Sequence, residues 1–324
     1  MRSYRISGYT FSSNLPIPEL AAVDEACADF VFELLSPVED PIEPAHWTNH
    51  WAAPDGSVWL AFASIERGYL LRFPEFADFI ISTDARSIHC HPRGDVPSET
   101  VRHLLLNQVI PLVLNHLGNL VLHAAACATP HGVIAFMGKT GMGKSTLAAG
   151  FGQQGFPILS DDCLLVKEQN GVVMSIPSYP GIRLWPESVS ALFSEEPELQ
   201  PLAHYTEKKR LLLEQHHPEA PAPLASVYVL SCPPARNRVT GVTIGRLRTS
   251  EALLEIIKHT FQLDSANPER LHRSFKQYEW LARSVPFFRL TFPRQHSYLS
   301  AVTAALLNHL ETLQPVKTLW PSTT

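Results

Sequence analysis

The stretch Gly132-Val-Ile-Ala-Phe-Met-Gly138-Lys-Thr-Gly141-Met-Gly143-Lys144-Ser145-Thr146 decides how the rest of this chain is interpreted. It opens with an apolar run typical of a buried strand, continues as a glycine-rich turn, and ends in residues that suit the start of a helix. Residues 138–145 match Gly-x-x-x-x-Gly-Lys-Ser/Thr, a phosphate-binding loop when a strand precedes it and a helix follows. This context favours a nucleotide site over a glycine turn that caps a helix carrying a lysine.

The order of residue types in the loop has a chemical reason. Small residues let successive backbone N–H groups point into one concavity, and the helix N-terminus adds partial positive charge there. Lys144 would reach the β- and γ-phosphates, and the Ser145 hydroxyl would ligate Mg²⁺. The predicted nucleotide-binding residues of the loop are Gly138, Lys139, Thr140, Gly141, Met142, Gly143, Lys144, Ser145 and Thr146.

Length and composition limit the class of protein. A chain of 324 residues can hold one large or two ordinary domains, and 45% hydrophobic with 18% charged residues is ordinary for a globular protein. The net charge of −5 gives no bulk electrostatic basis for binding nucleic acid. The sequence shows neither a long apolar run nor a secretory signal, so we expect a cytoplasmic protein without a membrane partner.

The cysteines and histidines give no strong metal signal. Five scattered cysteines form no Cys-x-x-Cys pair, which is typical of reduced structural thiols. In the run His89-Cys90-His91, alternation along a strand would place Cys90 opposite the two histidines. No second ligand pair of standard spacing follows, so an ordinary strand end is favoured over a metal site.

Residues 1–97 are predicted to form a small β-rich N-terminal domain, a candidate for binding substrate or partner. Short β-branched and aromatic runs, separated by Pro, Gly, Asp and Asn, begin at Tyr4, Phe30, Ser57, Gly68, Ala77 and Ser87. A loop over 41–54 carries two tryptophans and two histidines. Aromatic packing over the sheet is the favoured role of this loop, with an interaction surface as the alternative.

The hydrophobic period changes at Ser98, where we place the start of a catalytic domain over 98–324. A helix is predicted over 98–116, with Ser98 as its N-cap and a kink or division at Pro111. A buried strand over 119–128 and a turn at 129–132 then lead into the strand that precedes the phosphate loop.

After the loop, a helix over 144–153 and a strand over 156–160 complete a strand–helix–strand unit that terminates in Asp161-Asp162. Such a unit brings the carboxylates to the sheet edge that holds the loop, where open α/β sheets bind ligands. The fold class is therefore α/β. Further strands are expected at 163–166, 171–176, 181–185, 227–230 and 287–292, and helices at 250–261, 268–285 and 299–313.

The carboxylate pair separates the classes of phosphate-loop protein. The guanine-specificity and transporter signatures are absent from the sequence. One aspartate beside Mg²⁺ is enough to organise the metal. Phosphoryl transfer to a hydroxyl also benefits from a base that accepts the proton of the acceptor hydroxyl. Asp161 and Asp162 could divide these roles, although a turn-forming pair with one capping and one solvated residue is the alternative.

These residues resemble a known family. His123, the phosphate loop and Leu159-Ser-Asp-Asp together are similar to the catalytic domain of HPr kinase/phosphorylase, whose loop and sheet are similar to those of phosphoenolpyruvate carboxykinase. The resemblance implies a mixed sheet with flanking helices. The HPr enzymes assemble as rings of subunits, so the resemblance leaves open that this chain forms a homo-oligomer. Tyr179-Pro-Gly-Ile-Arg-Leu-Trp departs from the family signature, because Pro180-Gly181 replaces the acidic residue before Ile-Arg. That replacement leaves phosphorylase activity open.

The whole-length pattern, from about residue 98 to 310, is more similar to the HPr-kinase-like proteins of lasso-peptide clusters. The shared features are the N-terminal domain of about a hundred residues, the Pro-Gly-Ile-Arg-Leu-Trp-Pro run, a basic segment near Lys209, and Phe288-Arg-Leu-Thr-Phe-Pro-Arg. Those proteins are kinases that modify a hydroxyl at or near the C-terminus of a precursor peptide. The resemblance is most specific between His123 and Asp162.

The resemblance also implies roles for individual residues. Asp161 would be the base toward the acceptor hydroxyl, Asp162 the Mg²⁺-side carboxylate, and His123 a neighbour of the transferred phosphate. For His123 a satisfied core histidine is the alternative. Arg183, Lys209 and Arg210 are candidates to neutralise charge on the phosphoryl group. For the basic segment at 208–210, a solvent-exposed charged face is an equally good explanation. Asp161→Asn is therefore expected to abolish transfer while ATP still binds.

The sequence thus predicts an ATP- and Mg²⁺-dependent kinase that acts on a serine-type hydroxyl of a peptide or small protein. A ribosomally made, lasso-type precursor peptide is the favoured acceptor. Two alternatives stay open: a nucleotide-binding regulatory protein without phosphoryl transfer, and an HPr-type or small-metabolite kinase.

Overall fold

The computed structural model describes residues 1–324 except 25–26, 38–41, 54, 196, 214–216, 219, 232–239, 265 and 314–324. The chain divides into two compact units. Unit 1 contains Met1–Leu117 together with Leu202–Thr206, and unit 2 contains Gly118–Pro201 together with Glu207–Thr324. Each unit is described separately below.

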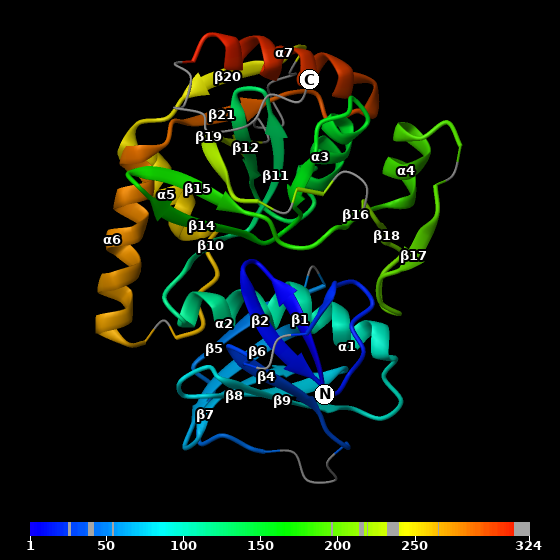
Figure 1. Ribbon diagram of the computed structural model, residues 1–324, viewed down its shortest axis with the longest axis vertical. Helices are drawn as coiled ribbons and strands as arrows, with labels where there is room; N and C mark the ends of the chain where they lie inside the picture. Colours follow the sequence, from blue (N-terminus) through cyan, green and yellow to red (C-terminus); the bar gives the residue numbers. More distant parts are fainter. Residues whose placement is uncertain are drawn as a thin grey trace. The chain divides into compact units, whose positions relative to one another are not determined.

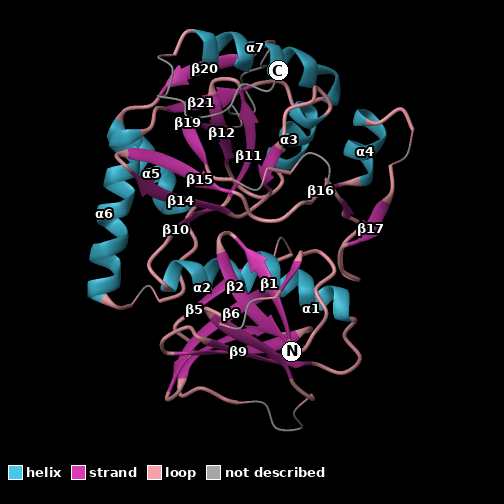
Figure 2. Ribbon diagram, viewed as in Figure 1, coloured by secondary structure: helices cyan, strands magenta, loops and turns pink. Residues whose placement is uncertain are grey.

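Unit 1 is built on a sheet with the strand order β3-β1-β2-β4-β9-β8-β7-β6-β5 (Figures 1 and 2). Neighbouring strands are antiparallel, except that β4 pairs in parallel with both β2 and β9. The strands are β1 (Arg2–Ile6), β2 (Tyr9–Ser13), β3 (Ala22–Val23), β4 (Phe30–Leu34), β5 (Asn49–Ala52), β6 (Val58–Ile65), β7 (Gly68–Phe73), β8 (Ala77–Ser82) and β9 (Ser87–Pro92). The β-rich character predicted for this part of the chain is confirmed.

The loop predicted over 41–54 differs from expectation in two ways. Its described part contains β5, which pairs with β6, and its tryptophans do not sink into the sheet. Trp47 and Trp51 stay 36% and 40% exposed, and the Arg72 guanidinium lies 5.1 Å from the Trp47 ring centroid. A cation over the ring partly covers Trp47, which is a common arrangement for an amphipathic aromatic at a surface.

The helical segment that was expected to open the catalytic domain belongs to unit 1, so the boundary lies at Leu117 instead of residue 97. The segment is α1 (Ser98–Leu104), a π-helical turn η1 (Leu105–Val109) and α2 (Ile110–His116). Almost all of its apolar side chains are buried, and His116 packs edge-on against Tyr69 of β7. Burial of this apolar stripe against unit 1 outweighs the change of period seen in the sequence.

Two local features of this segment have simple causes. Pro111 lacks an N–H and its ring crowds the carbonyl four residues earlier, and the chain widens into the π-turn immediately before it. The predicted Ser98 cap is not formed. Pro97 occupies the N-cap position, and the Ser98 hydroxyl instead accepts a hydrogen bond from Arg102 at 3.0 Å.

Residues Leu202–Thr206 complete unit 1 although they lie far along the sequence. The Tyr205 ring packs 4.8 Å from the ring centroid of Phe76 and 5.2 Å from that of Trp59. His204 is hydrogen-bonded through Nδ1 to the Thr100 hydroxyl at 2.8 Å. The segment is thus held by aromatic packing and by a polar contact to α1.

Unit 2 contains a mixed sheet with the order β10-β14-β15-β19-β12-β11-β13, and β21 also pairs with β19 and with β20. The strands are β10 (Leu120–Leu122), β11 (Ala124–Thr129), β12 (Gly132–Met137), β13 (Ile158–Ser160), β14 (Leu164–Gln169), β15 (Val172–Ile176), β19 (Ala222–Leu230), β20 (Thr243–Arg246) and β21 (Phe287–Thr291). The α/β class and the mixed sheet are confirmed. The predicted strand–helix–strand unit forms with β11 inserted between its two strands, antiparallel to both.

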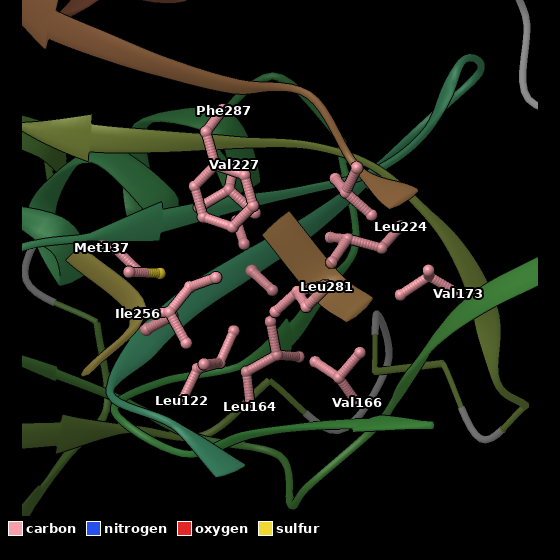
Figure 3. Close-up of a cluster of buried hydrophobic side chains, with 14 of the residues drawn as sticks. Leu122, Met137, Leu164, Val166, Val173, Leu224, Val227, Ile256, Leu281 and Phe287 are labelled. Atoms are coloured by element: carbon pink, nitrogen blue, oxygen red, sulfur yellow. The ribbon is translucent and has the colours of Figure 1, made fainter. Parts of the chain in front are cut away.

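Helices cover both faces of this sheet because its strands are apolar on both sides. One face packs on α5 (Thr249–Lys258) and α6 (Pro268–Ser284), and Figure 3 shows Ile256 and Leu281 from these helices among the sheet residues Leu122, Val166 and Val227. The other face packs on α3 (Lys144–Gly152) and α7 (Leu299–Glu311). A smaller sheet has the order β16-β18-β17, formed by β16 (Ile182–Leu184), β17 (Leu199–Pro201) and β18 (Lys209–Leu211), and α4 (Pro186–Leu192) follows β16.

The remaining sequence expectations concern cysteines, histidines and membrane segments. Cys90 is buried in β9, while His89 and His91 are half-buried. His89 contacts the Ser87 hydroxyl, and His91 contacts the Ser36 carbonyl. Cys27, Cys90, Cys127 and Cys163 carry no disulfide, and Cys232 lies outside the described residues. Among the helices of the described chain, none is long and apolar enough to cross a membrane.

Candidate nucleotide-binding site

The phosphate loop connects β12 to α3 through glycines with positive φ. Gly138 has φ 154°, and a Cβ at this position would lie 3.3 Å from the Leu230 side chain. Gly143 is the N-cap of α3 and is left-handed, with φ 91°. Because L-residues with a side chain rarely adopt this conformation, the glycines of the motif are needed to turn the loop onto the helix N-terminus.

Lys144 is the first residue of α3 and is 4% exposed. Its ammonium donates to the Gly138 carbonyl at 3.0 Å and lies 3.9 Å from Asp162 Oδ1. Burial lowers the pKa of Lys144, and the neighbouring aspartates offset only part of that effect. The side chain therefore lies folded along the loop, where an anionic ligand would stabilise its charged form.

Asp161 directly follows β13 and lies in a buried polar cluster around the Ser145 hydroxyl. Ser145 Oγ donates to Asp161 Oδ1 at 2.7 Å, while Oδ2 accepts from Arg183 N at 3.0 Å and Arg183 Nε at 3.1 Å. A further Arg183 nitrogen donates to the Asp161 backbone carbonyl. Asp161 thus holds the hydroxyl proton of Ser145, which leaves the lone pairs of that oxygen available to another ligand.

Asp162 has a left-handed backbone, with φ 66°, and its carboxylate shares Arg183 with Asp161 but contacts His123 in place of Ser145. Its Oδ1 lies 3.1 Å from His123 Nε2, and its Oδ2 lies 3.3 Å from the Arg183 guanidinium. Burial alone would raise the pKa of Asp162, but the charge of Arg183 and the contact with His123 hold that pKa well below its usual range. Asp162 is therefore an ionised carboxylate with 27% of its side chain exposed.

His123 reaches this cluster because the predicted strand over 119–128 is broken at this residue. The chain pairs with β14 before His123 and with β12 and β13 after it. The backbone N–H of His123 donates to the backbone carbonyl of His259 at 2.7 Å. The ring centroids of His123 and Phe261 lie 5.9 Å apart. With Asp162 ionised, the imidazole carries its proton on Nε2 and donates it to the carboxylate.

A cavity of about 340 Å³ opens over the loop, and every residue that lines it belongs to unit 2. Residues 140–146 contribute to its lining. Asp162, Arg183 and Lys208 contribute charged groups, and the segment 292–299 after β21 also contributes lining residues. The volume falls in the range of about 300–1,000 Å³ that is usual for small-molecule sites.

The basic segment contributes differently from its sequence prediction. Lys208 lines the cavity, with its ammonium 5.4 Å from the ring centroid of Trp185. Lys209 is exposed and Arg210 is buried, and neither of them is among the lining residues. In the register of β18 against β16, Arg210 pairs with Arg183 and Lys209 pairs with Leu184. Side-chain alternation therefore places Lys209 and Arg210 on opposite faces of the small sheet.

Several lining residues were not singled out from the sequence. Ser188 of α4 bonds Thr146 Oγ1 at 3.0 Å and His296 Nε2 at 3.3 Å. Arg294 donates to the Gly141 carbonyl and contacts Met142 Sδ at 3.9 Å. The Phe-Pro-Arg end of the strand at 287–292 was the available signal, since Pro293 terminates the strand at the sheet edge that holds the loop.

The cluster fits a magnesium ion bound together with phosphates. Mg²⁺ prefers oxygen ligands and usually takes one or two protein groups plus substrate phosphates and waters. Ser145 with Asp161 behind it provides such an oxygen pair. The described residues hold no cluster of three or more His, Cys, Asp or Glu side chains suited to a metal, so a dedicated cage is not part of the described chain.

Comparison with known proteins adds little to this geometry. No protein-family model and no curated protein matches the chain. One similar solved structure is the Hpr(Ser) kinase/phosphatase from Coxiella burnetii, with a TM-score of 0.31 and 10% identity. The match covers 59% of this chain and 97% of that chain. A similarity at this TM-score does not indicate a function, and the function proposed below rests on the geometry of the site.

Proposed function

We propose that this chain is an ATP- and Mg²⁺-dependent kinase that transfers the γ-phosphoryl group to a serine-type hydroxyl of a peptide or small protein. The observation that carries the proposal is the 2.7 Å contact between Ser145 of the phosphate loop and Asp161 at the end of β13. A phosphate-loop hydroxyl joined to a strand-end aspartate is the arrangement that phosphate-loop enzymes use to hold Mg²⁺. Mg²⁺ bound there would neutralise charge on the phosphates.

The geometry favours an exchange of the two aspartate roles inferred from the family resemblance. Asp161 is buried and engaged by Ser145 and Arg183, so it suits the metal side by orienting the hydroxyl. Asp162 lines the cavity beside the Lys144 ammonium, where the γ-phosphate would lie. We therefore assign Asp162 as the group that orients the acceptor hydroxyl and takes its proton.

The cations around Asp162 give this assignment a physical basis. In the unliganded protein, Arg183, His123 and Lys144 hold the carboxylate ionised. A triphosphate that engages Lys144 and Arg183 would compensate their charge, which makes Asp162 more basic when the donor is bound. His123 would keep the carboxylate oriented through its 3.1 Å contact, and Arg183 would meet charge that develops on the phosphoryl oxygens.

The acceptor class rests on sequence resemblance together with one feature of the site. Trp185 stays 43% exposed at the cavity, beneath the Lys208 ammonium. An exposed aromatic with a cation above it suits contact with a peptide chain, because Trp gives a large contact area at low entropic cost. A ribosomally made precursor peptide, such as one from a lasso-peptide cluster, is the acceptor that we propose.

Intact-mass spectrometry tests the proposal directly. The protein is incubated with γ-labelled ATP, Mg²⁺ and the short peptides encoded beside its gene, and each peptide is weighed. We expect a gain of one or more phosphates on one peptide, lost with Lys144→Ala and retained with Lys276→Ala, a substitution of an exposed lysine on α6.

Other results would lead elsewhere. ATP binding without any modified peptide, followed by phosphorylation of a small metabolite or an HPr-type protein, would replace the proposed acceptor. ATP binding without transfer to any acceptor would favour the regulatory alternative. Equal peptide phosphorylation by the wild type and Lys144→Ala would contradict the proposed site.

A further inference from the structure

The cavity is lined by two chemically different sets of side chains. Asp162 and Arg183 gather beside Lys144, with ion-pair distances of 3.9 Å from Lys144 to Asp162 and 3.3 Å from Arg183 to Asp162, and Lys208 adds another cation to the lining. Phe292 and Leu299 are apolar members of the same lining. An anionic chain suits the charged set, and an uncharged aromatic group suits the apolar set.

The phosphate loop itself indicates which end of a bound triphosphate would lie near the segment 292–299. The lysine of such a loop reaches the β- and γ-phosphates, while the loop and the first turn of the helix cradle the α- and β-phosphates. The triphosphate would therefore run from Lys144 toward Thr146. Thr146 Oγ1 bonds Ser188 Oγ, which in turn bonds His296 Nε2. The α-phosphate side of the loop thus adjoins the segment 292–299.

Side chains of this segment suit a nucleoside. Phe292 and Met142 are partly buried apolar groups packed on the core beneath α7, so they are held in place. The Arg294 guanidinium is anchored to the Gly141 carbonyl, which places a planar cation at the edge of the loop. Bases stack on aromatic rings and on arginine planes, and His296 offers a polar group on the ribose side.

We infer that the segment 292–299 is the nucleoside subsite of this chain, with Phe292 and Arg294 holding the base of the donor nucleotide and His296 facing its ribose. This inference rests on the proposed nucleotide site and goes further by naming the side chains of the cavity that take the base. Trp185 is another aromatic residue of the cavity lining and packs under Lys208. It therefore serves as a matched control for Phe292.

Paired calorimetric titrations with Mg·ATP and Mg·tripolyphosphate separate base binding from phosphate binding. The wild type should bind ATP at least about tenfold tighter than tripolyphosphate, since stacking on one aromatic residue typically contributes a factor of this size. Phe292→Ala should remove most of that preference and leave tripolyphosphate affinity unchanged. Trp185→Ala should keep the preference. Unchanged tripolyphosphate affinity also shows that the variant is folded.

Phe292→Leu provides a second variant that retains apolar volume and loses the stacking surface. It should lower the ATP preference and preserve core packing. Equal wild-type affinity for ATP and tripolyphosphate would overturn the subsite and leave the proposed kinase standing. Binding of neither ligand would overturn the proposed function itself. A preference that survives both Phe292 substitutions and is lost with Trp185→Ala would place the base on Trp185 and overturn the inference.

Discussion

Both units bury an aspartate against arginine, and they use the pair in different ways. In unit 1, Asp78 accepts from Arg72 at 2.9 Å and from Arg93 at 3.2 Å, and Arg72 also binds Glu43 and the Ile42 carbonyl. In unit 2, Asp161 and Asp162 share Arg183, and their remaining contacts go to the phosphate loop and to His123. The Asp–Arg pairs thus contact other protein groups in unit 1, whereas in unit 2 they lie at a cavity.

This difference shows how a structural ion cluster can be distinguished from a functional one. Asp78 is bound by Arg72 of β7 and by Arg93 directly after β9, so neighbouring side chains compensate its charge. Asp162 has a cationic neighbourhood beside a 340 Å³ cavity, with the Lys144 ammonium donating to loop carbonyls and lying 3.9 Å from the carboxylate. Anion binding would stabilise such a site, and that is the basis of the proposed function.

The largest effect is expected from substitution of the cavity-facing carboxylate. Asp162→Asn should lower the rate of phosphoryl transfer by about 10²–10⁴-fold, because it removes the base and keeps the side-chain shape. Asp161→Asn should chiefly raise the Mg²⁺ concentration required, because it loosens the orientation of Ser145. Single-turnover transfer rates, measured across a Mg²⁺ titration, separate the two effects. A fall in the transfer rate in Asp161→Asn alone that added Mg²⁺ does not recover would restore the roles implied by the family resemblance.

A smaller effect, on stability rather than catalysis, is expected at the closed cluster. Asp78→Ala should lower the free energy of unfolding by about 3–5 kcal/mol, because it leaves two partly buried guanidinium groups without their carboxylate. Urea denaturation followed by circular dichroism measures the loss, and ATP affinity in native buffer should not change. Asp84→Ala, at an exposed turn of the same sheet, is the matched control and should cost about 1 kcal/mol. Equal losses for both variants would mean that burial of the Asp78 cluster is unimportant.

The smallest of the three effects concerns pH and the residue behind His123. Burial, together with the nearby charges of His123, Lys144 and Lys258, lowers the pKa of His259 to about 4, and Glu255 opposes this shift only in part. The unfolded chain binds this proton near pH 6.5 and the folded chain does not, so the stability contribution is complete above that pH and declines as the pH falls toward 4. The expected loss from about pH 7.5 to about pH 5 is about 2 kcal/mol.

The variant His259→Gln isolates this contribution, because a side chain without a titrating group cannot take up the proton. The stability of the variant, measured by urea denaturation at both pH values, should fall by about 2 kcal/mol less than that of the wild type over the same interval. Parallel pH profiles for the two proteins would show that His259 does not titrate differently in the folded and unfolded chains.

Local sequence determined much of this protein. The glycine pattern at 138–143 predicted the turn between β12 and α3, because few residues other than glycine adopt the positive φ values observed there. Apolar periodicity located the helices α5, α6 and α7 and many strands of both units, since each of these elements buries one face or both, but it gave no indication of β2, β3, β5, β17, β18 or β20. The position of the aspartate pair at the end of a strand, at the sheet edge that holds the loop, also followed from the sequence.

Tertiary structure decided what depends on contacts between distant residues. Asp161 and Asp162 share Arg183, but Asp161 turns to Ser145 and the left-handed Asp162 turns to His123, and the break at His123 exists because the chain changes its strand partners there. The burial of α2 assigned residues 98–117 to unit 1, and the fold placed Lys208 at the cavity in place of Lys209 and Arg210. Hydrophobic period and residue spacing report on the local backbone alone, whereas register, strand exchange and burial are fixed by packing across the whole fold.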